Sequence, residues 1–158
     1  IQYKACGRLK MKGTYLYVGG FILPDKNAAA HRVLSNAKIL RRLGYQTIFV
    51  GVSKAKDGII GELKPEETQG FKFYEIDYPR NSVQWVHYLS SISILIKVLN
   101  RYKDIKGIVA YNYPAIGLAK LLLLSKGTGI PIIADATEWY GAASGSFFFR
   151  ILKAFLSA

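Results

Sequence analysis

The sequence predicts an α/β fold built on a doubly wound parallel sheet of about five or more strands. Short runs of β-branched and aromatic residues alternate with segments of helical periodicity along the chain, and this alternation is typical of a parallel sheet covered by helices on both faces. The chain has 158 residues, of which 51% are hydrophobic. One domain of that size buries a substantial core.

The first third of the chain predicts a strand–helix–strand unit. Residues 14–19 form a strand that ends in the tight turn Gly19-Gly20, and residues 46–51 form a second strand of the buried type. Between them, apolar residues recur at helical spacing in one stripe, up to a helix end at Gly44. Asp25 or Asn27 caps the start of this helix. The stripe consists of Ala30, Val33, Leu34, Ala37, Leu40 and Leu43.

The rest of the chain continues the alternation. Residues 52–70 are polar and contain glycines, so they predict a surface excursion. The further elements expected are a strand at 71–76, one long helix from its N-cap Ser82 to Tyr102, a strand at 106–111, a helix from Pro114 to Ser125 that Gly127 and Gly129 end, and a strand at 131–135. Residues 147–158 are amphipathic, with Phe148, Ile151, Leu152 and Phe155 on one face.

The charge of the chain is unevenly distributed. Lys and Arg number 22 against 10 acidic residues, for a net charge of +12. Residues 1–60 hold 11 Lys and Arg against Asp25 and Asp57, which gives +9, and the remaining residues carry +3. The asymmetry indicates an anionic partner, either nucleic acid, a phosphate-bearing ligand or an acidic membrane surface. A merely basic, well-solvated surface is the alternative.

Several classes of protein are excluded or disfavoured by composition. The one cysteine, Cys6, rules out an intrachain disulfide framework, and with only two histidines a structural zinc site is not expected. These counts suit a reducing compartment. The longest uncharged stretch, residues 81–96, contains polar residues and is too short to span a membrane. Nucleic-acid binding is disfavoured because no RRM, KH or zinc-finger pattern is present.

The candidate site residues follow the carboxyl ends of the expected strands, where open α/β sheets bind ligands. The Gly19-Gly20 turn is not a dinucleotide fingerprint, because the glycines of G-x-G-x-x-G are missing. Its backbone can still approach a ligand closely, and it leads into a helix whose first N–H groups favour anions and which carries His31 and Arg32. The alternative is a turn and a histidine that serve packing alone.

Two further groups follow later strands. Asp135 and Glu138 offer carboxylates for sugar hydroxyls, and Trp139 offers a face on which a sugar ring can stack. Alternatively, Asp135 caps the next helix and Trp139 packs in the core. Tyr111 and Asn112 end another strand, where Asn112 is either a ligand contact or an N-cap.

Three segments together resemble the N-terminal half of the family 4 glycosyltransferases. They are YVGGFILPDKNAAAHRV and the residues after it, the YNYP turn and DATEWYG. The resemblance runs from about residue 12 to the C-terminus, so residues 1–11 are expected to be an extension or a tag.

The resemblance implies one half of a GT-B fold, in which two Rossmann-like domains face a cleft. The N-terminal domain mainly binds the acceptor, and a C-terminal domain of the same polypeptide, expected after residue 158, binds the nucleotide-sugar donor. Transfer retains the anomeric configuration and needs neither a cofactor nor a metal held by an Asp-x-Asp motif, which is lacking here. The isolated domain is therefore expected to have little or no transferase activity.

The resemblance also assigns roles to single residues. Asp135 and Glu138 become the catalytic candidates, at a position where relatives place a histidine or an acid, although no histidine stands there in this sequence. The resemblance places Gly19, Gly20, His31 and Arg32 beside the substrates, and the positions of Asn27, Tyr111, Asn112 and Trp139 in loops and at strand ends make them further substrate-binding candidates.

The preferred interpretation is an acceptor-binding domain that works at the cytoplasmic face of a membrane on a glycan or lipid-linked acceptor. The basic residues of positions 1–60 would then attract the anionic surface, at ~1 kcal/mol for each. The alternative is a non-enzymatic α/β module that binds a small phosphorylated ligand. A receiver module would need acidic residues at the end of the first strand, and a flavin module would need a Ser/Thr-rich loop there; neither is present.

Overall fold

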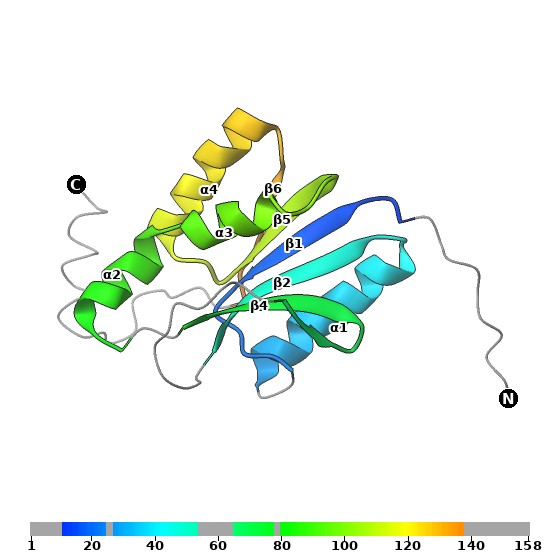
Figure 1. The fold of residues 1–158 in the computed structure, drawn as a ribbon, viewed down its shortest axis with the longest axis horizontal. Coiled ribbons are helices and arrows are strands. Elements are labelled where there is room, and N and C mark those ends of the chain that lie inside the picture. Colours follow the sequence, from blue (N-terminus) through cyan, green and yellow to red (C-terminus); the bar gives the residue numbers. More distant parts are fainter. Residues whose placement is uncertain (1–10, 25–26, 54–64, 78–79, 138–158) are drawn as a thin grey trace, which may run out of the picture.

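The computed structural model describes residues 11–24, 27–53, 65–77 and 80–137 (Figure 1). In chain order the elements are β1 (Thr14–Gly19), α1 (Ala28–Arg42), β2 (Gln46–Ser53), β3 (Glu66–Thr68), β4 (Phe71–Asp77), α2 (Ser82–Ser90), α3 (Ser93–Leu99), β5 (Ile105–Tyr111), α4 (Ala115–Thr128) and β6 (Ile132–Asp135). All five strands expected from the sequence are present, with ends that lie within two residues of those expected. The expected helix at 147–158 and the cap candidate Asp25 lie outside the described residues.

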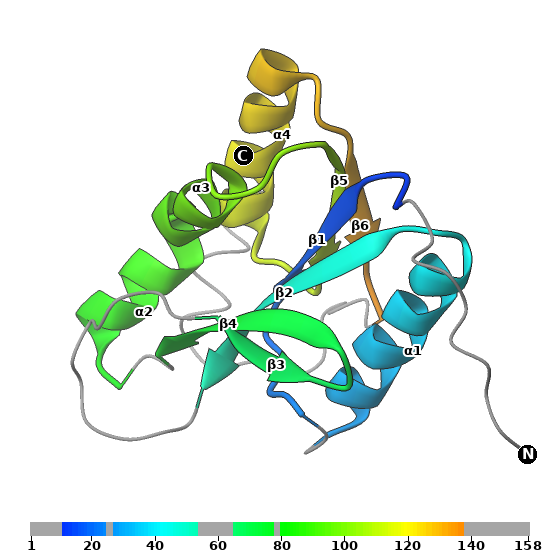
Figure 2. The same cartoon turned by 45° about the vertical axis from the view of Figure 1, so that its right-hand side comes forward.

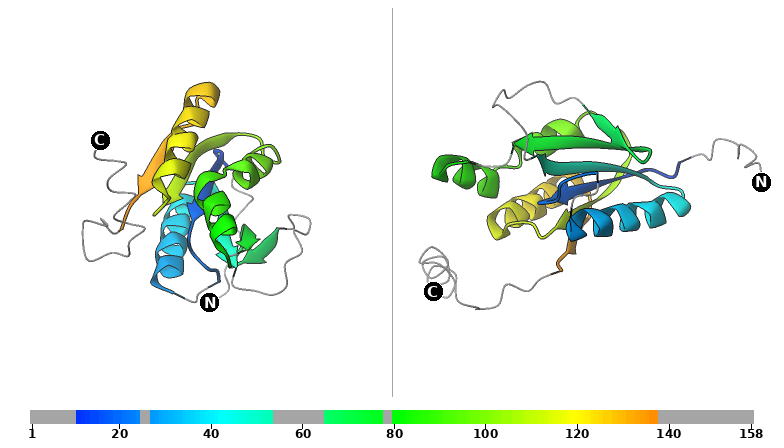
Figure 3. Two further views of the ribbon diagram at one scale, coloured as in Figure 1. Left: turned by 90° about the vertical axis from the view of Figure 1, so that its left-hand side faces the viewer. Right: turned by 90° about the horizontal axis from the view of Figure 1, so that it is seen from below.

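The sheet has six strands in the order β3-β4-β2-β1-β5-β6. Every neighbouring pair is parallel except β3 with β4. β1 lies in the interior, and the chain first adds strands on one side of it and then, from β5, on the other. Both views in Figure 3 show the result, with β6 at one margin of the sheet and β3 and β4 at the other. This is the doubly wound, Rossmann-like order, and the predicted fold class is confirmed.

Two apolar cores cover the two faces of the sheet, because successive strand residues point to opposite sides. α1 packs on one face, and α3 and α4 pack on the other (Figure 2). The α1 core contains Tyr17, Phe21, Leu23, Ala30, Val33, Leu34, Ala37, Phe49, Phe71, Phe73, Val109 and Tyr111. The opposite core contains Leu16, Val18, Ile48, Val50, Tyr74, Leu95, Val98, Leu99, Ile108, Ala110 and Leu121. No helix among the described residues is long and apolar enough to cross a membrane.

The short strand β3 lies within residues 52–70, for which the sequence predicted only a surface excursion. β3 pairs antiparallel with β4, from Glu66 opposite Phe73 to Thr68 opposite Phe71. Gln69 and Gly70 connect them with φ of 50° and 76°, and positive φ at both central residues is what a two-residue hairpin turn requires. β3 could not be predicted from its composition, because this edge strand is polar and buries no apolar face.

Two helices, α2 and α3, replace the single helix expected from residue 82 to residue 102. The break falls at Ser91, whose φ and ψ of −94° and 134° are those of a strand. The Ser90 hydroxyl donates to the carbonyl of Val86, and the Ser91 hydroxyl accepts from the amide of Ser93. Such side-chain bonds compete with helical ones, so the serine-rich stretch can end one helix and begin another.

The helix caps agree with the sequence at three ends and differ at two. Asn27 caps α1 by accepting from the amide of Ala30, Gly44 follows its last residues with φ of 90°, and Gly129, with φ of 73°, ends α4. The N-cap of α2 is Asn81 and not Ser82, because the Asn81 side chain accepts from the amide of Gln84. α4 continues past Ser125 and through Gly127 to Thr128.

Candidate functional site

The candidate site lies where the winding of the sheet reverses, between β1 and β5. These strands are neighbours, but the chain leaves β1 toward β2 and leaves β5 toward β6, on the opposite side. In such sheets the two connections diverge and leave a crevice beyond the carboxyl ends of the strands, where ligands bind. Gly19 and Tyr111 lie opposite each other at these ends. The predicted site residues on β1 and β5 therefore converge.

The two glycines after β1 have different structural requirements. A Cβ on Gly19 would overlap the carbonyl oxygen of Tyr111, so only glycine lets β1 and β5 approach this closely at their ends. Gly20 is exposed, and a Cβ there would lie 3.7 Å from the hydroxyl oxygen of Tyr88. The first glycine serves the sheet, whereas the second presents its backbone to the surface.

The loop after Gly20 folds over the end of β2. The amide of Val52 donates to the carbonyl of Phe21 over 2.9 Å. A Cβ on Gly51 would lie 2.6 Å from that same carbonyl oxygen. Glycine at position 51 is thus what allows the loop to lie directly on the strand.

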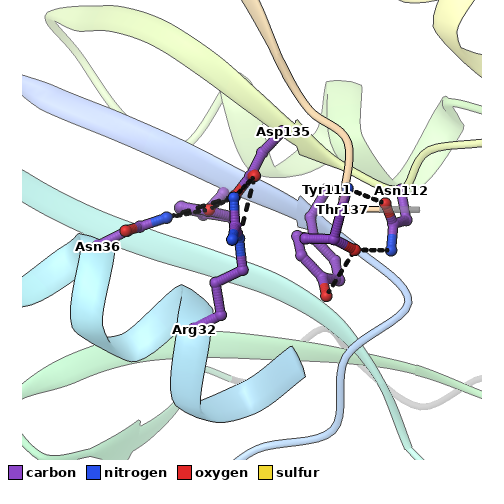
Figure 4. A network of polar contacts seen from close by, with 7 residues as sticks. Arg32, Asn36, Tyr111, Asn112, Asp135 and Thr137 are labelled. Atoms are coloured by element: carbon purple, nitrogen blue, oxygen red, sulfur yellow. Dashed lines mark hydrogen bonds and ion pairs between the residues drawn. The ribbon is translucent and has the colours of Figure 1, made fainter. Parts of the chain in front are cut away.

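A polar network centred on Asp135 joins β6 to β1 and α1 (Figure 4). Arg32 donates from Nη2 to Oδ1 over 2.7 Å and from Nε to the same oxygen over 3.2 Å. Tyr17 donates its hydroxyl hydrogen to Oδ2. Asn36 donates from Nδ2 to the Tyr17 hydroxyl oxygen over 3.0 Å and to Oδ2 over 3.4 Å. Both carboxylate oxygens are therefore occupied by donors.

This network holds Asp135 in its ionised form. Partial burial opposes ionisation, but the hydrogen bonds from Arg32 and Tyr17 outweigh it and lower the pKa of Asp135 below its usual value. Burial, together with the bond to Asp135, raises the pKa of Tyr17 well above the ordinary value for tyrosine. Tyr17 therefore stays a neutral donor. An ionised carboxylate surrounded by donors is suited to anchoring chain segments and poorly suited to accepting a proton.

Asn112 and Thr137 form a second link between β5 and the chain after β6. Asn112 donates from Nδ2 to the Thr137 hydroxyl over 2.7 Å, and its Oδ1 accepts from the Thr137 amide over 2.9 Å (Figure 4). Asn112 adopts a left-handed φ of 41°, which asparagine tolerates better than most residues. The alternative role of Asn112 as an N-cap is wrong, because Pro114 holds that position in α4.

The remaining predicted site residues occupy varied positions. Asn27 uses its side chain to cap α1. His31 is exposed on the first turn of that helix, and Tyr111 is buried in the α1 core with its hydroxyl 3.4 Å from the Thr137 hydroxyl. Glu138 and Trp139 lie outside the described residues.

Three residues of the site were missed from the sequence: Tyr17, Asn36 and Thr137. A signal for Asn36 was present, because it lies four residues after Arg32 and so shares its side of the helix. Tyr17 looked like an ordinary strand residue, and nothing in the pattern predicted that its hydroxyl would bond across β5 to β6. Among the residues that the structure describes, no group of three or more His, Cys, Asp or Glu side chains could hold a metal ion.

Comparison with known proteins gives one structural likeness. No protein-family model and no curated protein matches the sequence. Among solved structures, the chain is similar to a protein chain described as "Trehalose-6-phosphate from E. coli bound with UDP-2-fluoro glucose". The identity is 12% and the TM-score is 0.38. The match covers 63% of this chain and 27% of that one, so this chain spans about a quarter of the length of the protein it matches.

Proposed function

We propose that the chain is the acceptor-binding, N-terminal domain of a retaining glycosyltransferase. The observation that carries the proposal is the convergence of the Gly19-Gly20 turn, the first turns of α1 and the end of β6 where the winding reverses. These are the segments through which the sequence resembles family 4 glycosyltransferases. The nucleotide-sugar donor would bind mainly to a second domain, which leaves the first one inactive alone.

Within this proposal the two acidic candidates have separate roles. Asp135 is engaged by Arg32 and Tyr17, so it positions the segment after β6 and does not exchange a proton. Glu138, three residues further, would then be the catalytic candidate, and Trp139 would be the residue on which the sugar ring stacks. The exposed backbone at Gly20, together with His31, would border the phosphates of the acceptor.

Contact with an anionic membrane surface is also part of the proposal. We assign it to α2, α3 and α4, although most of the net positive charge lies in residues 1–60. Arg32 pairs with Asp135, and Arg41 lies over the ring of Phe71 while donating to the carbonyl of Gln69. Two of the four basic residues of α1 thus serve internal contacts.

The helices α2, α3 and α4 offer a better surface for a bilayer. They contain Lys97, Lys120 and Lys126 and no acidic residue. α2 and α4 pack against each other. Exposed apolar side chains on the three helices are Val83, Val86, Ile96, Ile116, Leu122 and Leu123. Apolar side chains among lysines suit the interface of an anionic membrane.

Nuclear magnetic resonance of the 158-residue chain tests the proposed function. The probes are a short-chain polyprenyl-diphosphate monosaccharide, UDP-glucose and FMN, each added alone. We expect the sugar-lipid probe to shift the amide signals of Gly20, His31 and Asn112, and UDP-glucose to leave them nearly unchanged. Signals from the far ends of the strands, such as those of Thr14 and Gly107, serve as internal controls.

Two outcomes would contradict the proposal. Tight binding of FMN at the same amides would favour the non-enzymatic module that binds a phosphorylated ligand. Failure of every probe in a panel of differing sugars and lipid phosphates would remove the acceptor role.

A further inference from the structure

An apolar surface lies exposed on the sheet face that carries α1. Of the helices that the structure describes, α1 alone covers this face, whereas α3 and α4 cover the other (Figure 2). Ile39 and Leu43 of α1 are 53% and 55% exposed, although the sequence pattern places Leu43 in the buried stripe. Ile133 of β6 is 46% exposed. We call Ile39, Leu43 and Ile133 the α1–β6 surface.

The two α1 residues of this surface continue the outer stripe of the helix that Arg32 and Asn36 begin. Arg32 and Asn36 both reach Asp135 at the end of β6. Ile39 and Leu43 each follow one of these two residues by seven positions. Seven residues make about two turns, so all four side chains lie along one stripe.

Ile133 lies at a matching depth on the strand. It precedes Asp135 by two residues and therefore points to the same face of β6, about 6.6 Å further from the carboxyl end. α1 runs opposite to the strands, because it connects the parallel pair β1 and β2. Ile39 and Leu43 follow Asn36 by three and seven residues, which is roughly 4.5 and 10.5 Å of helix. Leu43 and Ile133 thus lie beside each other's element along the edge strand β6, and Ile39 lies further from the sheet on the same stripe of α1.

We propose that residues 147–158 of this chain dock on the α1–β6 surface as an amphipathic helix beside α1. Their apolar residues Phe148, Ile151, Leu152 and Phe155 recur at positions i, i+3, i+4 and i+7, which forms one helix face. Arg150 and Lys153 fall outside that face and stay solvated. A parallel sheet of this kind buries both faces under helices.

The connection is long enough to reach the surface. The described chain ends at Thr137, and nine residues, 138–146, separate it from the docking segment. Nine extended residues span up to roughly 30 Å, whereas helices packed side by side lie about 8–10 Å apart. The docked segment would fix the far end of the connection. If the proposed function holds, the segment that carries Glu138 and Trp139 would then be attached at both of its ends.

Disulfide trapping in the full chain tests the docking. Cys6→Ser removes the native thiol, and Ile39→Cys with Leu152→Cys places one thiol on each partner. The control combines Val83→Cys with Leu152→Cys, because Val83 is an exposed residue of α2, which packs against α4 on the opposite side of the sheet. Under mild oxidation at low protein concentration, we expect the first pair to form an intrachain disulfide at least tenfold faster than the control.

A second measurement uses Ile133→Cys in the Cys6→Ser chain. We expect a maleimide to label this thiol at least tenfold more slowly than a thiol from Val83→Cys, and the added changes Phe148→Asp and Leu152→Asp to restore fast labelling. Circular dichroism of each variant confirms that it is folded.

Three results would overturn the inference: equal oxidation rates for the two pairs, labelling of Ile133→Cys that ignores the aspartates, or disulfides that join two chains at a rate set by concentration. The last result would assign the surface to a second copy. Since no sugar or lipid enters these measurements, they can succeed even if acceptor binding fails.

Discussion

Asp135 is the residue at which three elements of the molecule meet. Its carboxylate accepts from Arg32 and Asn36 of α1 and from Tyr17 of β1, while its own backbone ends β6. Tyr17 is almost fully buried, so it depends on this carboxylate and on Asn36 for hydrogen bonds. A buried hydroxyl without such partners would destabilise the fold.

Asp135→Asn should lower the free energy of unfolding by about 1–2 kcal/mol at neutral pH, because charge-assisted bonds become neutral ones and solvent screens the exposed side of the ion pair. The folded state lowers the pKa of Asp135. Its stabilising contribution is therefore complete above the pKa of the unfolded chain, near 4, and is lost as the pH falls through the lower folded value.

Urea unfolding at pH 7 and pH 3 measures the effect. The difference between wild type and Asp135→Asn should shrink at pH 3. A difference that stays constant with pH would show that the charge of Asp135 contributes nothing. Glu67→Gln, which removes the same charge from an exposed residue of β3, serves as the control for a general charge effect.

The adjacent glycines after β1 give a second prediction. Gly19→Ala should destabilise the fold by about 1–3 kcal/mol, because its Cβ would overlap the Tyr111 carbonyl and push β1 from β5. Gly20→Ala should change stability by no more than about 0.5 kcal/mol, because its Cβ meets only the Tyr88 hydroxyl at ordinary contact distance. Thermal unfolding distinguishes them. Equal losses would contradict the close approach of the strands.

At the scale of single residues, the sequence predicted which strand ends carry the polar residues of the candidate site but not how those residues bond to one another. Position after a strand was enough to select Asp135, Asn112 and the two glycines. The partners of Asp135 come from residues about a hundred positions earlier, and no local pattern carries that information. Tyr111 was selected by position as well, yet its side chain is buried.

At the scale of elements, two glycines near the end of α4 predict opposite effects. Gly127 lies within the helix, and a Cβ there would have no atom within 4 Å. Gly127→Ala should therefore stabilise the protein by about 0.5–1 kcal/mol through helix propensity. Gly129 caps the helix with a φ of 73°, so Gly129→Ala should cost about 1 kcal/mol.

Chemical denaturation of the two alanine variants compares them directly, and each is the control for the other because they differ by two positions. Destabilisation by Gly127→Ala would mean that α4 ends earlier than Thr128, near the Ser125 that the sequence favoured.

Elements that bury an apolar face were predicted from the sequence, and elements that do not were missed. β1, β2, β4 and β5 carry apolar residues to both cores, and their periodicity shows it. β3 owes its existence to the turn at Gln69-Gly70 and to pairing with β4. The division between α2 and α3 depends on serine side chains that a periodic pattern cannot distinguish from an uninterrupted helix.

At the scale of the whole molecule, the exposed lysines and apolar side chains of α2, α3 and α4 predict that this face of the molecule binds anionic membranes. Lys120→Glu with Lys126→Glu on α4 should weaken binding to vesicles of phosphatidylcholine and phosphatidylglycerol by about tenfold or more at low salt, given ~1 kcal/mol for each basic residue near the surface. Sedimentation of the protein with the vesicles measures this binding.

The control makes the same change of charge on the opposite face, with Lys38→Glu and Arg42→Glu on α1. It should reduce binding less than threefold, by the general effect of net charge. A larger loss from the α1 pair would instead assign the membrane contact to the basic residues of positions 1–60. If the wild-type chain does not bind the vesicles, the proposed membrane contact is wrong.

The bond between Val52 and Phe21 fixes the position of the loop beside the candidate site. The loop that follows β1 is fastened over the carboxyl end of β2. Among the described residues, the β2 side of the ends of β1 and β5 is therefore covered by the chain itself. A side chain at position 51 would place its Cβ 2.6 Å from the Phe21 carbonyl oxygen, so Gly51 determines where the loop that begins at Gly20 lies without being part of that loop.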